Sequence, residues 1–349
     1  MTQSAHSDIP TSVGAAFGIE DNANITPLSG GLINSTWLVE SAERKFVLQR
    51  LHDLFKPEVN AKIEAVTAHL QMKGVNTTSI IRTNDGSLSI MQDDHCWRGL
   101  SYLAGHTELM LANAVQARSV GQVLAEFHLS LQDFPKPEQL PVSMVHDIGK
   151  HCMALERALK DCATHRNIAA IEPIASSLRK HAAALPPLPS FPPAIIHGDP
   201  KTANFLFAES DVAEYLIDLD TVSRGQLLHD LGDAFRSWCN PRGEDTAETF
   251  FDLSLFDSAL EGYLSKAGRH IDKLVIENLP TAIETIYLEL GMRFCADALL
   301  ENYFAWDPST FRTASDHQLT RALGQLHAYE DCLAKREEMH ARIAQLTLE

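Results

Sequence analysis

The chain has 349 residues, with 29 Lys and Arg against 46 Asp and Glu, so its formal net charge is −17. Hydrophobic residues make up 45% of the chain, which is typical of a folded globular protein and excludes a disordered one. A charge this negative repels phosphate backbones and anionic lipids, so binding to nucleic acid or to a membrane surface is not expected.

Six cysteines are scattered through apolar stretches, and no two of them form a C-x-x-C pair. Reduced cysteines behave as small core residues, so we expect a reducing compartment, the cytoplasm. The first ten residues lack a basic segment followed by an apolar one, and no run of 18 apolar residues is free of charge. Neither a signal peptide nor a membrane span is therefore predicted.

The first hundred residues are predicted to be rich in strands. Short runs of β-branched and aromatic residues at 25–28, 33–39 and 45–51 are separated by turn-forming segments. A helix opens at Pro57 and ends at Gly74. Two further strands flank Asn84-Asp85-Gly86, which is a hairpin signal. The front of the chain is thus predicted as β-β-β-α-β-β.

From about Leu109 the pattern changes to helices, among them a long apolar one over residues 283–305. Pro-rich stretches at 134–141 and 185–193 are predicted to be loops. Between the second stretch and residue 240 lies an island of short strands at 194–196, 205–207 and 215–217. We therefore expect a sheet lobe over residues 1–100 and a helical lobe over residues 101–349.

The strand island contains the residues that carry chemistry. His197-Gly198-Asp199 is followed by Asn204, in the pattern H-G-D-x4-N, and then by Asp218 in an I-D-x-D sequence. This spacing suits phosphoryl transfer from a nucleotide, in which one carboxylate accepts a hydroxyl proton. An amide oxygen and a second carboxylate hold Mg²⁺ against the phosphate oxygens. H-G-D alone also fits a surface turn, but the combination favours phosphoryl transfer.

The combination resembles the protein-kinase-like phosphotransferases of the aminoglycoside phosphotransferase and choline kinase group, over nearly the whole chain. Those families carry H-G-D-x4-N and I-D-x-x where protein kinases have H-R-D-x4-N and D-F-G. The resemblance implies an α+β, protein-kinase-like two-lobe fold, with a small β-rich N-terminal lobe and a large, mainly helical C-terminal lobe. It implies ATP and Mg²⁺ as cofactors, Asp199 as the catalytic base, and Asn204 and Asp218 as Mg²⁺ ligands.

The same resemblance implies supporting roles around these three residues. His197 is expected to orient the loop by hydrogen bonding, and Asp230 is expected to brace it. Asp220 is expected either to contact metal or substrate or to make a structural hydrogen bond. Gly198 stands where a protein kinase has the arginine that clamps a phosphorylated activation loop, and no A-P-E follows Asp218. We therefore expect a small-molecule hydroxyl substrate and no protein substrate.

The resemblance places the nucleotide against the front of the chain. Gly30, Gly31 and Asn34 lie between the first two strands, where a kinase-like fold has its phosphate-covering loop. Two glycines in a hairpin also form ordinary turns, so the position in the fold decides the interpretation. Leu100 and Tyr102 lie in the expected hinge strand, whose backbone would bind the adenine edge and would not distinguish ATP from GTP.

On the third strand, Gln49 and Arg50 stand where the families usually place a Lys or Arg on the α- and β-phosphates. Adjacent strand residues face opposite ways, so only one of the two points at the nucleotide. We expect Arg50 to be the cation and Glu64 to pair with it, with Glu58 as the competing partner.

Two segments extend the resemblance to the N-acetylhexosamine 1-kinases: residues 47–51 with the helix after them, and residues 290–304. Asp233, Arg236 and Arg293 interrupt apolar helix faces and are candidates for a sugar pocket. The expected reaction is transfer of the γ-phosphate to a hydroxyl of a hexose or N-acetylhexosamine. The alternatives are a choline, homoserine or aminoglycoside kinase, and a non-catalytic nucleotide-binding protein of the same fold.

Overall fold

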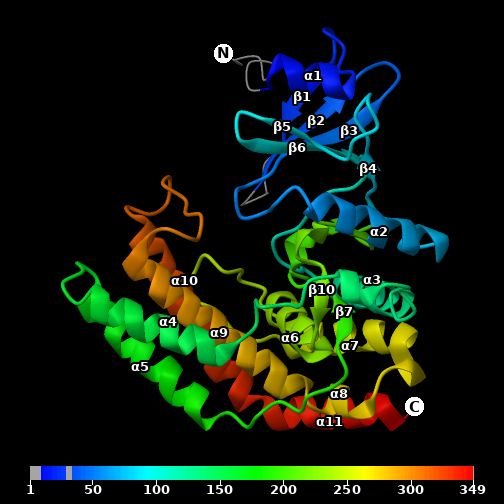
Figure 1. Cartoon of the computed structure of the whole chain (residues 1–349). Coiled ribbons are helices and arrows are strands. Elements are labelled where there is room, and N and C mark those ends of the chain that lie inside the picture. Colours follow the sequence, from blue (N-terminus) through cyan, green and yellow to red (C-terminus); the bar gives the residue numbers. More distant parts are fainter. Residues whose placement is uncertain (1–8, 29–33, 349) are drawn as a thin grey trace.

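Two lobes of unequal size make up the computed structural model, which describes residues 9–28 and 34–348. In Figure 1 the small N-terminal lobe, blue to cyan, stands on the broad helical C-terminal lobe. This is the expected α+β arrangement of a β-rich lobe followed by a mainly helical one. The N-terminal lobe comprises α1 (Thr11–Phe17), β1 (Asn24–Pro27), β2 (Ser35–Glu40), β3 (Lys45–Arg50), α2 (Val59–Met72), β4 (Ile80–Ile81), β5 (Ile90–Gln92) and β6 (His95–Ser101).

The strands of this lobe form one antiparallel sheet in the order β1-β2-β3-β6-β4, with β5 also paired to β6. Because side chains alternate along a strand, Trp37, Leu48 and Trp97 gather on one face, where Phe17 of α1 joins them in a buried cluster. The rings of Trp37 and Trp97 stack with centroids 5.3 Å apart. The other face of β3 is left to interact with the C-terminal lobe.

Two details of the predicted N-terminal lobe differ from the structure. Helix α1 precedes the first strand and was not predicted, because only two of its residues, Val13 and Phe17, are buried and its periodicity is short. The turn at Asn84-Asp85-Gly86 is present, with Gly86 at φ +87°. However, β4 and β5 on its two sides both pair with β6 and not with each other, because they lie one after the other along the same edge of β6, β4 at Gly99–Leu100 and β5 at His95–Trp97.

The C-terminal lobe is built around α9, which is buried along almost all of its length and contacts α4, α5, α6 and α10. The lobe comprises α3 (Ala114–Ser130), η2 (Pro137–Gln139), α4 (Ile148–Asp161), α5 (Ile168–Ala184), β7 (Ala194–Ile196), η3 (Thr202–Asn204), β8 (Phe205–Phe207), β9 (Ala213–Leu216), η4 (Leu219–Thr221), β10 (Ser223–Gly225), α6 (Leu227–Trp238), α7 (Leu253–Ala267), η5 (Gly268–His270), α8 (Lys273–Glu277), α9 (Leu279–Leu300), α10 (Ala314–Ala334) and α11 (Arg336–Leu348), where η denotes a 3₁₀ helix.

The predicted helix over residues 283–305 corresponds to α9, but α9 ends five residues earlier. Glu301 takes a left-handed conformation at φ +52°, which breaks the helical path. The carboxylate of Asp297 then accepts hydrogen bonds from the backbone N–H groups of Asn302, Tyr303 and Phe304. A side chain within the last turn thus fixes the following loop, which apolar periodicity does not reveal.

Helices α3 and α7 pack closely because each presents a glycine at the crossing. A Cβ atom on Gly121 would lie 2.2 Å from Ala259 O, and one on Gly262 would lie 2.0 Å from Arg118 O. The crossing anchors α3, which carries His128 toward the strand island. No helix within the described residues is long and apolar enough to cross a membrane. All six cysteines are free.

Candidate active site

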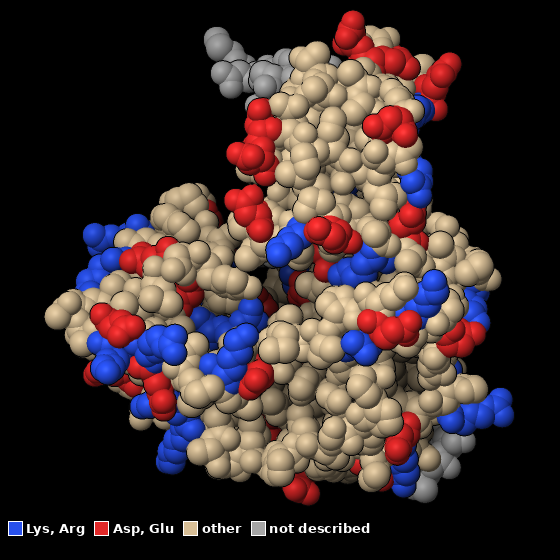
Figure 2. Space-filling view, in the orientation of Figure 1, with Lys and Arg blue, Asp and Glu red and all other residues tan. Residues whose placement is uncertain are grey.

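The candidate catalytic residues lie in the strand island, at the border between the lobes. Residues 197–204 link β7 to β8, and Asp218 follows β9 after a single residue. Strands β8 and β9 are antiparallel partners, and Ile217 N–H donates to the backbone oxygen of Asn204 at 2.9 Å. The start of one strand and the end of the other therefore lie side by side. Figure 2 shows the surface hollowed where the lobes meet.

Asp199, the predicted base, has a partly exposed carboxylate next to a cation. Its Oδ2 accepts hydrogen bonds from Lys201 Nζ at 2.5 Å and from Asn204 Nδ2 at 3.2 Å. Burial opposes the charge of Lys201, but the nearby Asp199 carboxylate outweighs it and raises the pKa of Lys201 above its usual range. Lys201 was not singled out from the sequence, although a lysine two residues after the predicted base was a visible signal.

Asn204 is oriented by its amide nitrogen. Nδ2 donates to the backbone oxygen of Asp199 at 2.7 Å as well as to the Asp199 carboxylate. Among the described residues, no hydrogen bond engages the side-chain oxygen Oδ1. An amide oxygen is an acceptable ligand for a hard divalent cation. The amide orientation is therefore compatible with the predicted metal-binding role.

Asp218 stands among other carboxylates in a strained turn. Its backbone is left-handed at φ +63°, an uncommon conformation for a residue other than glycine. The surface of the Asp218 residue is exposed, but the protein atoms that surround its carboxylate exclude much of the bulk water. This exclusion, together with the carboxylates of Asp220 and Asp199, raises the pKa of Asp218 to about 6, while Lys201 acts in the opposite direction. Such a group favours a bound cation or a proton.

Asp230 braces the loop, as expected. Oδ1 of Asp230 accepts a hydrogen bond from the N–H of Gly198 at 2.7 Å. Oδ2 accepts hydrogen bonds from the N–H of His197 at 2.8 Å and from Nε2 of His128 at 2.9 Å. Burial of Asp230 opposes its charge, but His128, His197 and the N–H of Gly198 together outweigh burial and lower the pKa of Asp230 below its usual value. A buried carboxylate with three donors is a rigid anchor for the loop.

His197 links the two halves of the island. Its Nε2 donates to the backbone oxygen of Ile217 at 2.9 Å, and its Nδ1 accepts the N–H of Asp199 at 3.3 Å. Burial lowers the pKa of His197. Because both ring nitrogens are engaged and the ring is kept neutral, His197 positions Asp199 relative to Asp218.

The predicted nucleotide-binding residues are only partly described. Gly30 and Gly31 lie outside the described residues. Asn34 donates its Nδ2 to Asp220 Oδ2 at 2.9 Å, so it points toward the turn that follows Asp218. Leu100 pairs with Val47 across β6 and β3.

Beyond the end of β6, Tyr102 lies under the ammonium of Lys45, at 4.1 Å from the ring centroid. Among the described residues, no hydrogen bond, ion pair or ring contact joins Tyr102 or Leu100 to the strand island. Their expected place beside the adenine thus depends on the position of β6 alone.

The expected pairing of Arg50 with Glu64 is wrong. Arg50 is opposite Trp97 on the face of the sheet that α1 covers, and its Nη2 donates to Ser35 Oγ at 3.2 Å. Glu64 instead pairs with Arg82 at 2.5 Å. Alternation along β3 explains the result, because the neighbouring Gln49 points to the other face, toward the C-terminal lobe.

The cation on the interlobe face is Arg98 of β6, which was not predicted. Arg98 is opposite Gln49 in the antiparallel register, and Gln49 Oε1 accepts from Arg98 Nε at 2.9 Å. The guanidinium forms a buried ion pair with Asp220 at 2.6 Å. An arginine within the apolar run Cys96-Trp97-Arg98-Gly99-Leu100 was the available sequence signal, since a buried arginine needs a partner.

The predicted acceptor residues occupy two places. Asp233 and Arg236 are both buried on α6, and Asp233 Oδ1 accepts from Arg236 Nε at 3.1 Å and Nη2 at 2.9 Å. Arg236 also bonds to Glu244. Arg293 lies on a different helix, α9, and its guanidinium lies over the rings of Tyr303 and Phe304. Within the described residues, no hydrogen bond or ion pair joins Arg293 to the Asp233–Arg236 pair.

Known proteins resemble this chain in sequence and in fold. The model of a family described as the phosphotransferase enzyme family matches residues 24–264. A homoserine kinase of Rhodopseudomonas palustris (strain HaA2) is 26% identical over 230 residues, which cover 64% of this chain and 66% of that protein. A second, from Bradyrhizobium sp. (strain ORS 278), is 24% identical over 61% of this chain and 63% of its own length. Both matches span slightly less than two thirds of those relatives.

Solved structures share the fold over most of the chain. An amicoumacin kinase in complex with AMP-PNP and Ca²⁺ superposes with a TM-score of 0.63 at 13% identity, covering 91% of each chain. A microcompartment-associated aminopropanol kinase has the same TM-score at 16% identity and covers 95% of this chain and 98% of its own. The expected kinase-like fold is thereby confirmed.

Proposed function

This chain belongs to the phosphotransferase enzyme family, and from that premise we propose that it is an ATP- and Mg²⁺-dependent kinase of a small hydroxyl compound. The observation that carries the proposal is the convergence of Asp199, Asn204 and Asp218 in one cluster of loops that Asp230 and His197 hold together. As part of the same proposal, residues 1–100 and 101–349 act as nucleotide-binding and acceptor-binding lobes. The free cysteines support a cytoplasmic location.

Asp199 is proposed as the general base. Its ionised carboxylate accepts the proton of the acceptor hydroxyl while that oxygen bonds to the γ-phosphorus and the bond to the β-phosphate oxygen breaks. The ammonium of Lys201 lies 2.5 Å from this carboxylate and holds it in place by a charge-assisted hydrogen bond. The products are a phosphate monoester, ADP and a proton released from Asp199.

The residues present fit a hard divalent cation. Asn204 Oδ1 and the Asp218 carboxylate are oxygen donors. The pKa of Asp218 is raised to about 6 by loss of bulk water and by the carboxylates of Asp220 and Asp199, and a bound cation would offset both effects. Asn204 and Asp218 would hold Mg²⁺, which when bound neutralises charge on the phosphate oxygens. Adenine is proposed to lie along the end of β6 near Leu100 and Tyr102, with the phosphates toward Asn34.

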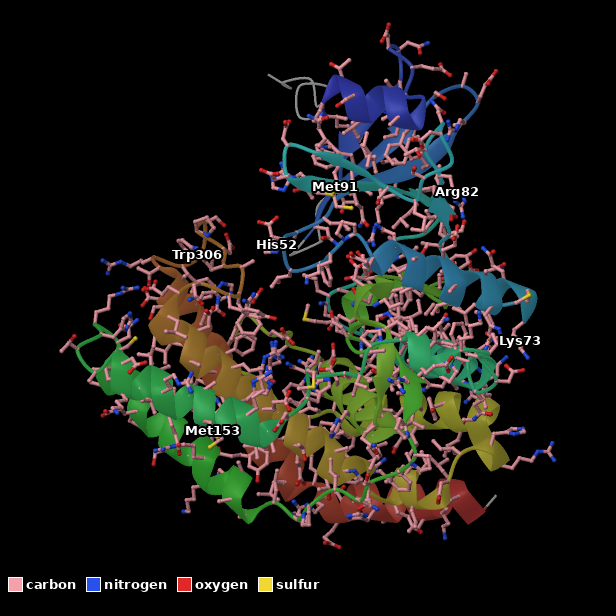
Figure 3. The ribbon with its side chains drawn as sticks, viewed as in Figure 1. His52, Lys73, Arg82, Met91, Met153 and Trp306 are labelled. Atoms are coloured by element: carbon pink, nitrogen blue, oxygen red, sulfur yellow. The ribbon has the colours of Figure 1, made fainter. Side chains whose placement is uncertain are left out.

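For the acceptor, we propose the anomeric hydroxyl of a hexose or N-acetylhexosamine. The resemblance of residues 290–304 to the hexosamine kinases supports this choice. Partly exposed aromatic rings also support it: Tyr303 lies beside Arg293, and Trp306 is 37% exposed. Figure 3 shows Trp306 and His52 on the two sides of the opening between the lobes. Aromatic faces and a guanidinium suit a neutral ring that carries hydroxyl groups.

An amino alcohol is the second candidate, and one observation favours it. Two carboxylates, Asp233 and Glu244, share the single guanidinium of Arg236, so this cluster carries one net negative charge that an ammonium group would balance. The relatives named homoserine kinase and aminopropanol kinase agree with such an acceptor.

The test is a product assay by phosphorus NMR with MgATP and single acceptors: N-acetylglucosamine, N-acetylgalactosamine, galactose, homoserine, 1-amino-2-propanol, choline and kanamycin. We expect a sugar 1-phosphate signal that requires both Mg²⁺ and the sugar. Turnover confined to the amine-bearing acceptors would replace the sugar by the second candidate. If ATP remained intact with every acceptor, the proposed kinase activity would be contradicted.

A further inference from the structure

A buried ion pair joins the two lobes beside the candidate metal site. Arg98 Nη1 lies 2.6 Å from Asp220 Oδ1, and Nη2 lies 3.0 Å from Asp220 Oδ2, so the two groups meet as a two-pronged fork. Arg98 belongs to β6 of the N-terminal lobe, and Asp220 belongs to η4 of the C-terminal lobe. Their side chains are 2% and 1% exposed. Charges this buried are stable only with each other's compensation.

Gln49 fixes the direction of the arginine. Its Oε1 accepts hydrogen bonds from Arg98 Nε at 2.9 Å and Nη2 at 2.7 Å, while its own amide nitrogen donates to Thr36 Oγ1 at 3.2 Å. Gln49 occupies the position on β3 where the resembling families usually have a cation. Here that position instead holds a neutral acceptor, and the positive charge stands on the neighbouring strand.

Two further side chains of the N-terminal lobe reach the same turn. Asn34 Nδ2 donates to Asp220 Oδ2 at 2.9 Å. Lys62 of α2 donates to the backbone oxygens of Asp220 at 2.6 Å and Val222 at 2.9 Å. One side chain each from the residues just before β2, from α2 and from β6 therefore contacts the turn that contains Asp220, on η4 or on the residue after it.

The held turn begins immediately after Asp218. Asp218 is the residue before η4 and takes the left-handed conformation that starts the turn, so a shift of Asp220 moves the Asp218 carboxylate as well. The guanidinium of Arg98 has no exposed edge from which to bind a phosphate while it is engaged by Asp220 and Gln49. Its position thus favours an effect through Asp218 over direct contact with the nucleotide.

We propose that Arg98 and Asp220 form an interlobe latch that positions the metal ligand Asp218, with Gln49 orienting Arg98. This inference rests on the proposed function and deepens it, because it assigns the coupling of the lobes to a β6–η4 pair and not to a cation on β3. Arg98 and Asp220 are positioning residues: neither contacts substrate, and both act on Asp218.

A latch and a phosphate contact differ in how two substitutions combine. Removing one partner of a buried ion pair leaves the other charge uncompensated, whereas removing both leaves a neutral pair of similar shape. For a latch, Asp220→Asn therefore repairs much of the damage caused by Arg98→Gln. For a phosphate contact, the affinity lost with Arg98 is not regained by changing Asp220.

The experiment compares Arg98→Gln, Asp220→Asn and the double variant in the full chain. Arg50→Gln is the matched control, because it makes the same change on the opposite face of the adjacent strand. Binding of AMP-PNP with Mg²⁺ is measured by calorimetry, the thermal midpoint by unfolding, and kcat and KM for ATP with the acceptor found above. We expect each single substitution to weaken Mg²⁺-dependent binding and kcat by about tenfold, and the double variant to recover to within about threefold of wild type.

The latch would be overturned in favour of a phosphate contact by the following result: Arg98→Gln loses binding, the double variant loses as much, and Asp220→Asn alone binds like wild type. If Arg98→Gln does not fold, Arg98→Lys decides the matter, because it keeps the charge without the fork. It should retain the thermal midpoint more closely than kcat. Suppose that the wild-type protein has no transferase activity but that the two substitutions are coupled in their effect on nucleotide binding. The proposed function would then be contradicted and the latch would stand. If the wild-type protein is active but the effects of the two substitutions simply add, the latch would be contradicted and the proposed function would stand.

Discussion

At the scale of single residues, the two carboxylates of the candidate site have opposite surroundings. Asp199 accepts a hydrogen bond from the ammonium of Lys201 and is half-exposed. Asp218 lies near two other carboxylates, and its pKa is raised to about 6. One group is therefore prepared to take a proton from an acceptor, and the other is prepared to take a cation.

Asp199→Asn removes the proton acceptor and keeps the shape of the side chain. We expect phosphoryl transfer to fall by about 10²–10⁴, the usual range for loss of a general base, with MgATP affinity nearly unchanged. Turnover and calorimetric binding are the two measurements. Asp94→Asn is the matched control, because it lies in the β5–β6 turn at φ +62°, which Asn also tolerates. Full activity of Asp199→Asn would remove Asp199 from the mechanism.

Asp218→Asn should have opposite effects on metal binding and on stability. The raised pKa means that the ionised carboxylate of Asp218 is disfavoured in the folded chain. Its ionisation therefore destabilises the fold above about pH 6, and this destabilisation disappears as the pH falls toward 3.8, the ordinary pKa of the group. The variant should lose Mg²⁺-dependent nucleotide binding, yet unfold about 1–2 °C higher than wild type at pH 8 without metal. The difference should disappear near pH 4.

For wild type, the same pKa predicts that Mg²⁺-dependent nucleotide binding weakens as the pH falls through about 6, because the protonated carboxyl group no longer attracts the cation. A thermal midpoint of Asp218→Asn at or below that of wild type at pH 8 would contradict the assigned charge repulsion. Binding of AMP-PNP with Mg²⁺ that stays constant from pH 5 to pH 8 would contradict Asp218 as a ligand.

At the scale of elements, the strand island was predictable because its strands and its polar residues follow each other closely. Strands at 194–196 and 205–207 lie where expected. The face of β3 was harder to predict, since a period of two allows either Gln49 or Arg50 to point inward. The choice depends on the covering helix α1, whose short apolar pattern gave no signal. Arg98 was missed for a related reason: its partner Asp220 is 122 residues away.

Asp230 of α6 binds the loop that follows β7, and these hydrogen bonds yield a prediction about stability. Asp230→Asn replaces one acceptor oxygen by an amide nitrogen that faces N–H donors of His197 and Gly198. Leaving buried donors unsatisfied should lower the free energy of unfolding by about 2–3 kcal/mol. Denaturant unfolding measures this change. Asp211→Asn, in an exposed turn at φ +62°, should stay within about 0.5 kcal/mol of wild type.

A loss as small as that of the control would mean that the carboxylate of Asp230 is replaceable by any polar group. The brace would then be a consequence of the loop conformation and not its cause. A large loss would show that the helix α6, through one buried side chain, fixes the geometry of the candidate base.

At the scale of the whole molecule, the order of a β-rich lobe and a helical lobe was predictable from the change in periodicity near residue 109. The contacts between the lobes were not, because they depend on single polar side chains such as Lys62, whose ammonium reaches two backbone oxygens of the other lobe. Burial lowers the pKa of Lys62 to about 8. A polar residue on an amphipathic helix is expected to face solvent, so its inward orientation carries no sequence signal.

Because the candidate site lies between the lobes, a ligand bound there should stabilise both together. Binding to the folded state alone contributes about 2.7 kcal/mol at a ligand concentration 100 times its Kd, so AMP-PNP with Mg²⁺ at that concentration should raise the thermal midpoint by about 4–8 °C. Calorimetric unfolding measures the shift. With EDTA in place of Mg²⁺, and in Asp218→Asn with Mg²⁺, the rise should shrink to less than about half. An equal rise in all three samples would mean that the nucleotide binds without the metal ligands proposed here, and a shift confined to one of two separate transitions would place it within a single lobe.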